Sequence, residues 1–430
     1  MTPASAARSF FRRRVDLRHA TAVVDRALTS PVLRNKVLFW ALALFCSTWF
    51  FFQTVSFIAE WDTDSPSYYT AANGLLQKIN IYDDREFMPL ADSLFGKGLV
   101  VYPYIYPPLL AQICLPLAVL PPTTYFLMLY ILNVALTFLA IYLILVLLDL
   151  KRVASILAAV FPFALLISNE PLLTTIHHGQ VNLFVLDVIL VSLLCQKKGH
   201  PGRAGFFLGL AVFVKIYPVL LVLPFIFFKR LRLLAAFALN SLALLAVSVL
   251  VSGTKPWLDF ARSTVELFVS RPDSPFTRGF QDSIGNVSFK NFLSELFARL
   301  GVPSSLVVPT LAVLLAAAFA VIFVRPRKRA VSRDLALESS FLLILTLVFA
   351  PITWSHHFVL LLFPAAYVFK RILVERRYGA FFVLAPLLSQ IFYVIPWGAF
   401  PFNQVRLFAT LGFFGLLLYL AQVKTRTSHA

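Results

Sequence analysis

The chain has 430 residues, of which 59% are hydrophobic and only 13% are charged, and its mean hydropathy is +0.81. A water-soluble domain of this size could not cover so much apolar surface, so the composition excludes an ordinary soluble enzyme and indicates that a bilayer surrounds most of the chain. The net charge of +18 comes from short Lys and Arg clusters between apolar stretches, as the positive-inside rule describes for cytoplasmic loops. No continuous basic face is available to follow phosphates, which argues against nucleic acid as a partner.

Charge and hydropathy divide the chain into three parts. Residues 1–35 form a basic arm and residues 424–430 form a short tail, and we expect both on the cytoplasmic side. Residues 36–423 form a transmembrane domain with two outer loops, at about 60–105 and 253–304. The three cysteines all lie in apolar stretches, so we interpret them as small buried hydrophobes rather than as a disulfide or metal framework.

The alternation of apolar stretches with basic clusters predicts ten full spans. They lie at about 36–59, 123–148, 153–170, 181–196, 233–252, 305–324, 337–353, 357–370, 379–397 and 404–423. Segments 106–120 and 205–228 do not fit as ordinary spans, and we expect re-entrant or half-length hairpins there. In the first outer loop, Tyr68–Leu76 and Phe87–Leu94 are expected to form short interfacial helices. The sequence therefore predicts an all-α integral membrane protein with about ten to thirteen transmembrane segments, depending on the counting.

The first outer loop holds seven of the twenty acidic residues, although the chain is otherwise basic. It is also rich in tyrosine. The parity of the spans places two histidine pairs, His177-His178 and His356-His357, at the same face of the membrane. Because the acidic loop and both histidine pairs are expected at one face of the membrane, we predict that the active site lies at that face.

The motifs in and after this loop resemble those of a known family. Asp64-Ser-Pro-Ser-Tyr68-Tyr69-Thr-Ala-Ala72 is similar to the D-x-x-x-Y-Y-x-A-A signature of the polyprenol-phosphate-mannose-dependent mannosyltransferases, which form glycosyltransferase family 87 in the GT-C class. Further pieces match in order: Tyr106-Pro107-Pro108, Gly179-Gln180-Val181-Asn182, Gly205 to Gly209 running into Lys215 and Pro218, Asn286-Val287-Ser288, and Pro351 to His357. Thr353 replaces the serine that is usual in the last piece. The resemblance covers about residues 60–360 and implies a GT-C fold.

The resemblance implies transfer of a sugar from a lipid phosphate, with inversion and without a metal or other cofactor. Such a transfer needs a base that takes the proton of the acceptor hydroxyl. We favour Asp64 as this base because it holds the signature position. Asp62 is the alternative base, or a partner that raises the pKa of the base. Asp64 could also cap a helix that begins near Pro66, and the two roles are compatible.

The leaving phosphate requires positive charge or hydrogen-bond donors at the outer face. The candidates are Arg278 and Lys290 in the second loop, Lys215 in an apolar hairpin, and the histidines His177, His178, His356 and His357. An unpaired ammonium at membrane depth is costly, so Lys215 should line a cavity or else extend its amine to the cytoplasmic interface. A zinc site at the histidine pairs and a metal site at Asp83-Asp84 are lesser alternatives, and we predict no metal.

The sugar and the lipid headgroup need amides and aromatic rings. Gln180, Asn182 and Asn286 are the candidate amides, and Tyr68, Tyr69 and Trp354 are the candidate rings. The competing interpretations are hydrogen bonds between helices for the amides and a membrane-interface belt for the aromatic residues.

These observations predict a membrane glycosyltransferase. By resemblance, it moves mannose or a related hexose from a polyprenyl-phosphate donor to a hydroxyl of a glycolipid or polysaccharide acceptor. The expected location is the periplasmic face of a bacterial inner membrane. The alternatives are a transporter or flippase of lipid-linked sugars and a polysaccharide ligase. A transporter would be expected to show inverted repeats, and no repeat is visible in the sequence.

Overall fold

The computed structural model describes residues 31–58, 64–150, 156–269, 285–323, 334–393 and 400–422. Every regular element named in these ranges is an α-helix or a 3-10 helix, which confirms the all-α fold class. Two predicted site residues, Asp62 and Arg278, lie outside the described residues, as do most of the basic arm and the C-terminal tail.

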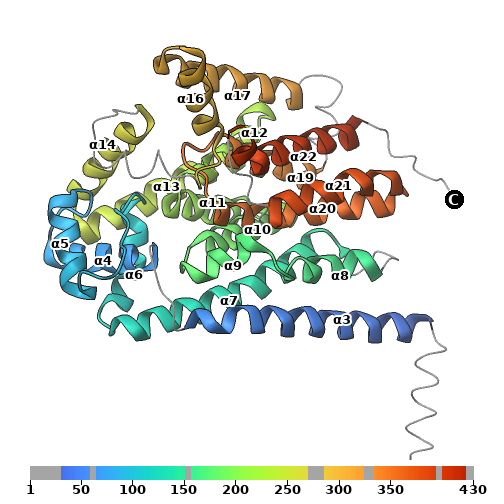
Figure 1. Cartoon of the computed structure of the whole chain (residues 1–430), viewed down its shortest axis with the longest axis horizontal. Coiled ribbons are helices and arrows are strands. Elements are labelled where there is room, and N and C mark those ends of the chain that lie inside the picture. The colour runs from blue at the N-terminus through green and yellow to red at the C-terminus, as the bar shows by residue number, and fades with distance from the viewer. Residues whose placement is uncertain are drawn as a thin grey trace, which may run out of the picture.

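Six segments of the described chain are long and apolar enough to cross a bilayer. They are α3 with η1 (Pro31–Thr54, Val55–Ile58), α7 (Pro122–Leu147), α13 (Leu231–Ser252), η4 with α17 (Ser304–Leu306, Val307–Phe323), η5 with α20 (Ser355–Leu361, Leu362–Val374) and η7 with α22 (Phe402–Gln404, Val405–Gln422). Each coincides with a predicted span to within a few residues. Helices α3 and α7 run along the long axis of the molecule in Figure 1.

The remaining apolar helices are shorter. Helices α9 (Glu170–His177) and α10 (Asn182–Lys197) form a pair bent by 114°, which makes a seventh crossing if the pair counts as one span. The others are α6 (Pro108–Ala118), α8 (Ile156–Ala164), α11 (Pro201–Val214), η3 with α12 (Tyr217–Val222, Leu223–Phe227), α19 (Leu335–Phe349) and η6 with α21 (Tyr378–Ala380, Phe381–Phe392). Among the described residues, full-length helices are therefore fewer than the ten spans that we expected.

Both segments that did not fit as ordinary spans form short helices in the structure. Helix α6 has only 11 residues, fewer than the ~20 that a crossing requires. Between α11 and η3 the chain breaks at Lys215, which has extended dihedral angles, and a proline follows at the second position of η3. Proline is tolerated in the first turn of a helix, so η3 can begin here. The same proline prevents α11 from continuing into η3. This break places Lys215 at the C-terminal end of α11, where the residue is buried inside the protein.

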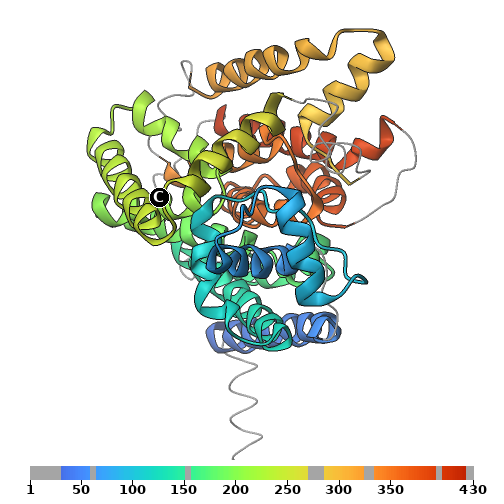
Figure 2. The same cartoon turned by 90° about the vertical axis from the view of Figure 1, so that its left-hand side faces the viewer.

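The outer loops carry four further helices: α4 (Asp64–Gln77), α5 (Asp84–Phe95), α14 (Lys255–Val269) and α16 (Phe289–Leu300). The first two confirm the short helices predicted in the first loop. Helix α5 begins where the Asp83 side chain accepts a hydrogen bond from the Arg85 N–H at 3.0 Å, as an N-cap does. Helices α4, α5, α6 and α14 gather at the left-hand end of the molecule in Figure 1, and Figure 2 looks onto that end.

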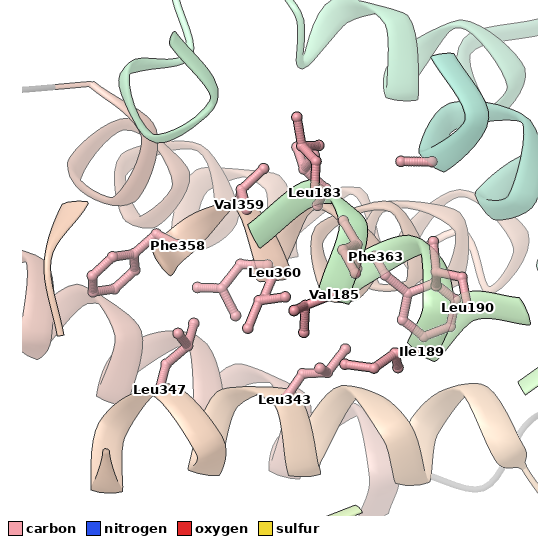
Figure 3. Close-up of a cluster of buried hydrophobic side chains, with 14 of the residues drawn as sticks. Leu183, Val185, Ile189, Leu190, Leu343, Leu347, Phe358, Val359, Leu360 and Phe363 are labelled. Carbon is pink, nitrogen blue, oxygen red and sulfur yellow. The ribbon is translucent and has the colours of Figure 1, made fainter. Parts of the chain in front are cut away.

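The core beneath these loops is built from α10, α19 and the η5–α20 segment. Figure 3 shows side chains of all three in one buried cluster, among them Val185 of α10, Leu343 of α19 and Leu360. In a bilayer this packing stabilises the fold mainly through van der Waals contact, because lipid chains are as apolar as leucine. The packing holds the start of η5 against the start of α10, and it is at these two helix starts that polar side chains meet.

Candidate active site

The first turn of α4 holds Asp64, which is 4% exposed. The Ser65 N–H donates to the His178 carbonyl at 3.1 Å and ties this turn to the α9–α10 bend. Gly179 in the bend has φ +59°, and a Cβ there would lie 2.6 Å from Ser65 Cβ. Only glycine fits this left-handed position and close approach, so Gly179 permits Asp64 to face the bend.

A chain of hydrogen bonds leads from Asp64 to the bend. Tyr106 Oη donates to Asp64 Oδ1 at 3.1 Å, and Gln180 Nε2 donates to Tyr106 Oη at 3.4 Å. Tyr68 Oη donates to Gln180 Oε1 at 2.9 Å. Tyr68 is fully buried, so its hydroxyl serves this network, and its ring packs edge-on against the Tyr106 ring.

Lys215 enters the same network from the other side. Its Nζ donates to Gln180 Oε1 at 3.1 Å and to Asn182 Oδ1 at 2.7 Å, and it lies 5.0 Å from the centre of the Tyr106 ring. Lys215 is 3% exposed, so its amine remains inside the protein and does not extend to an interface. Both partners are neutral amide oxygens, which accept hydrogen bonds from the amine, and neither is a carboxylate.

The turn before η5 brings the second histidine pair to Lys215. His357 Nδ1 accepts the Trp354 N–H at 3.0 Å, and His357 Nε2 lies 3.4 Å from Lys215 Nζ. Because Nδ1 accepts, a neutral His357 ring carries its proton on Nε2. Two donors therefore face one another, and both can donate to a single anionic oxygen.

His178 lies close enough to Asp64 for its charge to oppose the rise that burial causes in the pKa of that carboxyl, and His356 lies beside His178. Their ring centres are 6.0 Å apart, and the His356 carbonyl accepts from Asn182 Nδ2 at 3.1 Å. Within the described residues, His356 Nε2 is buried without a hydrogen-bond partner. A buried polar atom of this kind is costly unless a ligand or water satisfies it.

The Asn286–Ser288 segment supports the Trp354 turn from the second outer loop. Asn286 Oδ1 accepts the Thr353 N–H at 3.1 Å, and the Ser288 hydroxyl donates to the Pro351 carbonyl at 3.1 Å. The side chain of Asn286 therefore holds backbone in this structure. Lys290 follows in the first turn of α16 and is 8% exposed, and burial lowers its pKa below the ordinary value.

Two predicted residues point elsewhere. Tyr69 Oη donates to the Leu120 carbonyl at 2.7 Å, and its ring packs on Tyr125 in a separate aromatic cluster. His177 packs on Phe57, with ring centres 4.7 Å apart, and on the neighbouring His178. The structure thus brings together Asp64, Tyr68, Gln180, Asn182, Lys215, His356 and His357, with His178 at the edge.

Burial controls the electrostatics of Asp64. Loss of hydration raises its pKa above the ordinary 3.8, and this effect exceeds the opposing influence of the nearby His178 and Lys215 charges and of the hydrogen bonds from Gln180 and Tyr106. A carboxylate with a raised pKa is a better proton acceptor than a solvated one. Asp64 has the burial and the hydrogen-bond geometry of a general base.

A cleft adjoins this network and is lined by three of its residues. Lys215, Tyr106 and His357 are among its lining residues, and so is Trp354, whose ring stacks on Tyr102 with centres 5.8 Å apart. The other lining residues are mostly apolar: Ile105, Pro107, Ile216, Tyr217, Phe260, Thr264, Ala350, Pro351 and Ile352. A largely apolar cleft with a few polar side chains in its lining suits an amphipathic lipid substrate.

Sequence reasoning missed Tyr106 and Tyr217 as site residues. Tyr217 Oη donates to Asn182 Oδ1 at 3.1 Å and, like Tyr106, lies beside the Lys215 ammonium. The signal for Tyr106 was present, because it begins one of the matching motifs, but nothing in the sequence indicates that its hydroxyl meets Asp64. Within the described residues, no three His, Cys, Asp or Glu side chains form a group that could hold a metal ion.

The fold and this site define the class of the protein as a multi-helix membrane protein with a buried acid–cation site at one end. The sequence profile described as glycosyltransferase family 87 matches residues 104–351, more than half of the chain, so the chain belongs to that family. Family membership accords with the GT-C fold that the motifs implied.

A curated relative is the polyprenol-phosphate-mannose-dependent alpha-(1-2)-phosphatidylinositol mannoside mannosyltransferase of Mycolicibacterium smegmatis. It is 26% identical over 238 residues, which are 53% of this chain and 49% of the relative. The chain thus spans about half the length of the relative that it matches. No solved structure matches this chain.

Proposed function

We propose that the protein is a membrane glycosyltransferase that takes mannose or a related hexose from a polyprenyl phosphate. The observation that carries this proposal is the connection, through Tyr106, of a buried carboxylate, Asp64, to the amine of Lys215, which lines a largely apolar cleft. A base for the acceptor and a cation for a lipid phosphate are the two groups that the reaction needs. The family profile and the name of the relative support the same donor class.

Asp64 acts on the acceptor. Its carboxylate takes the proton of the acceptor hydroxyl while the hydroxyl oxygen forms a bond to the anomeric carbon of the sugar. The bond from that carbon to the phosphate oxygen breaks in the same step, and its electron pair leaves with the polyprenyl phosphate. One displacement inverts the anomeric centre and requires no covalent sugar–enzyme intermediate. Asp62 remains the alternative base.

Lys215 and His357 act on the leaving group. Their two donors, 3.4 Å apart, converge on one anionic oxygen and stabilise the charge that develops on the phosphate. When Lys215 turns to the phosphate, the amide oxygens of Gln180 and Asn182 become available to sugar hydroxyls. Trp354 contributes a ring face to the lining of the cleft. Arg278 and Lys290 are the further phosphate-binding candidates from the second loop.

The acceptor is a glycolipid or polysaccharide hydroxyl, and the site faces the periplasmic side of a bacterial inner membrane. The basic clusters at the opposite helix ends support this orientation through the positive-inside rule. The acceptor in the name of the relative is a phosphatidylinositol mannoside, which supports a glycolipid first.

The test uses the purified full chain with radiolabelled polyprenyl-phosphate-mannose, polyprenyl-phosphate-glucose as the donor control, and a panel of glycolipid acceptors, with EDTA present. We expect label from the mannosyl donor on a glycolipid, in a product of inverted anomeric configuration. Label that stays on the donor with every acceptor, while the donor binds, would contradict the proposal and favour a flippase.

A further inference from the structure

A second cavity lies at the other end of the transmembrane domain from Asp64. Helix α10 leaves the site at Asn182 and ends at Lys197, and the 14 residues of α11 then return to Lys215. At about 1.5 Å per residue, the turn between these helices is roughly 20 Å from the site. A cavity of about 490 Å³ lies between this turn and the start of α13. We call it the basic groove; Gln196, His200, Lys229, Arg230 and Arg232 supply its polar lining.

The groove has positive charge in excess. Arg230 is neutralised, because its Nη1 and Nη2 each donate to a Glu338 carboxylate oxygen at 2.8 Å. This pair anchors the wall of the groove to α19. Lys229 and Arg232 are exposed, and none of the lining residues is acidic. Two cationic side chains thus face the groove without a carboxylate among its lining, and the titratable His200 lies beside them.

Two helices begin at the groove and add to its positive potential. Neither α11, after His200, nor α13, after Arg230, has a side-chain hydrogen bond that caps its first turn. The positive ends of the two helix dipoles favour an anion in addition to the two side chains. Gly205 allows α11 and α13 to start close together, because a Cβ there would lie 2.5 Å from the backbone of Ala236.

The groove also adjoins a lipid-facing surface. Helix α13 is a candidate membrane span of which only Ser248 is fully buried. Leu231 at the groove is 67% exposed, and Leu239 and Leu242, further along α13, are 68% and 63% exposed. A molecule with an anionic head in the groove could therefore lay its hydrocarbon chains along α13.

We propose that the basic groove binds the headgroup of an anionic phospholipid from the leaflet opposite the candidate active site, which we expect to be cytoplasmic. The phosphate diester lies between Lys229 and Arg232, and the acyl chains follow the exposed face of α13. Basic pockets between transmembrane helices bind acidic lipid headgroups in this way. This site is independent of the sugar-transfer reaction.

The test compares binding of phosphatidylglycerol and phosphatidylcholine to the full chain in detergent by native mass spectrometry. The groove variant is Lys229→Gln/Arg232→Gln. The matched control is Lys36→Gln/Arg376→Gln, which removes one lysine and one arginine, both exposed, from the same face away from the groove. A charge-preserving variant, Lys229→Arg/Arg232→Lys, tests whether charge rather than folding is responsible.

We expect wild type to bind phosphatidylglycerol in preference to phosphatidylcholine. The groove variant should bind phosphatidylglycerol roughly 10- to 30-fold more weakly, while the matched control and the charge-preserving variant stay near wild type. Equal loss in the groove variant and the matched control would show that the face attracts lipid only through its overall charge, and would overturn the proposal. Unchanged binding in the groove variant would also overturn it.

Discussion

The phenol of Tyr106 links Asp64 to Lys215. Its hydroxyl donates to Asp64 Oδ1 at 3.1 Å, and Lys215 Nζ lies 5.0 Å from the centre of its ring. A neutral group thus contacts both the carboxylate and the ammonium through different parts of its side chain. It fixes the carboxylate oxygen by a charged hydrogen bond and the ammonium by a cation–π contact.

Replacing Tyr106 by phenylalanine should separate these two roles. The ring and its contact with Lys215 remain, but the hydrogen bond to Asp64 is lost. A hydrogen bond to a charged group contributes about 1.5–3 kcal/mol, so kcat/KM should fall roughly 10- to 100-fold. Tyr125→Phe is the matched control, since its buried hydroxyl meets only Cys114 Sγ at 3.9 Å. Equal kcat/KM for Tyr106→Phe and wild type would contradict this role.

The pH dependence of transfer should report Asp64. Burial raises its pKa above 3.8, and the base works only when it is deprotonated, so kcat/KM should fall as the pH drops through that raised value. The Tyr106 hydrogen bond opposes the shift. Tyr106→Phe should therefore raise the pKa further and move the acid limb of the profile to higher pH. If the acid limb of the profile stays at the same pH in Tyr106→Phe, a group other than Asp64 controls the pH dependence.

Lys215→Met should weaken binding of the donor without lowering the stability of the protein. Gln180 Oε1 still accepts from Tyr68, and Asn182 Oδ1 still accepts from Tyr217, so no buried acceptor is left unpaired. Burying an ammonium is itself costly, so the melting temperature should stay the same or rise. Donor binding should weaken at least ~10-fold, the usual order for losing a charged contact.

The control for Lys215→Met is Lys255→Met, whose side chain is 72% exposed on α14. It removes the same charge from the protein without touching the cleft. A large drop in melting temperature together with normal donor binding would assign Lys215 a structural role instead.

Gly179→Ala tests the bend that positions Asp64. Alanine is strained at φ +59°, and its Cβ would press on Ser65 next to Asp64. We expect a loss of about 1–3 kcal/mol in the free energy of unfolding and a decrease in transfer. Gly98→Ala in the first outer loop, where a Cβ meets nothing within 4 Å, should change neither. Wild-type stability and activity in Gly179→Ala would show that the bend tolerates a side chain.

The sequence predicted the positions of the long helices and the break at which Lys215 lies. Hydropathy and the positive charges located all six long spans, and Pro218 located the break between α11 and η3 at which Lys215 lies. These are local signals, since each depends on residues near one another in the chain.

The partners within the site could not be predicted, because they come from distant segments. Nothing in the sequence shows that Tyr68 turns toward Gln180 while its neighbour Tyr69 turns away to Leu120. Adjacent helical positions differ by about 100° around the axis, and tertiary packing decides which one faces the site. The use of the Asn286 side chain to hold Thr353 likewise depends on two loops meeting.

The central claim is that Asp64 is the base, and the most direct measurement is the rate of mannosyl transfer by Asp64→Asn beside Asp92→Asn. Both variants remove one carboxylate from the first outer loop, but Asp92 is exposed on α5. We predict that Asp64→Asn binds the donor and stays folded while transfer falls ~10²- to 10⁴-fold, and that Asp92→Asn transfers at the wild-type rate. Transfer at the wild-type rate by a folded Asp64→Asn variant would contradict the claim and point to Asp62.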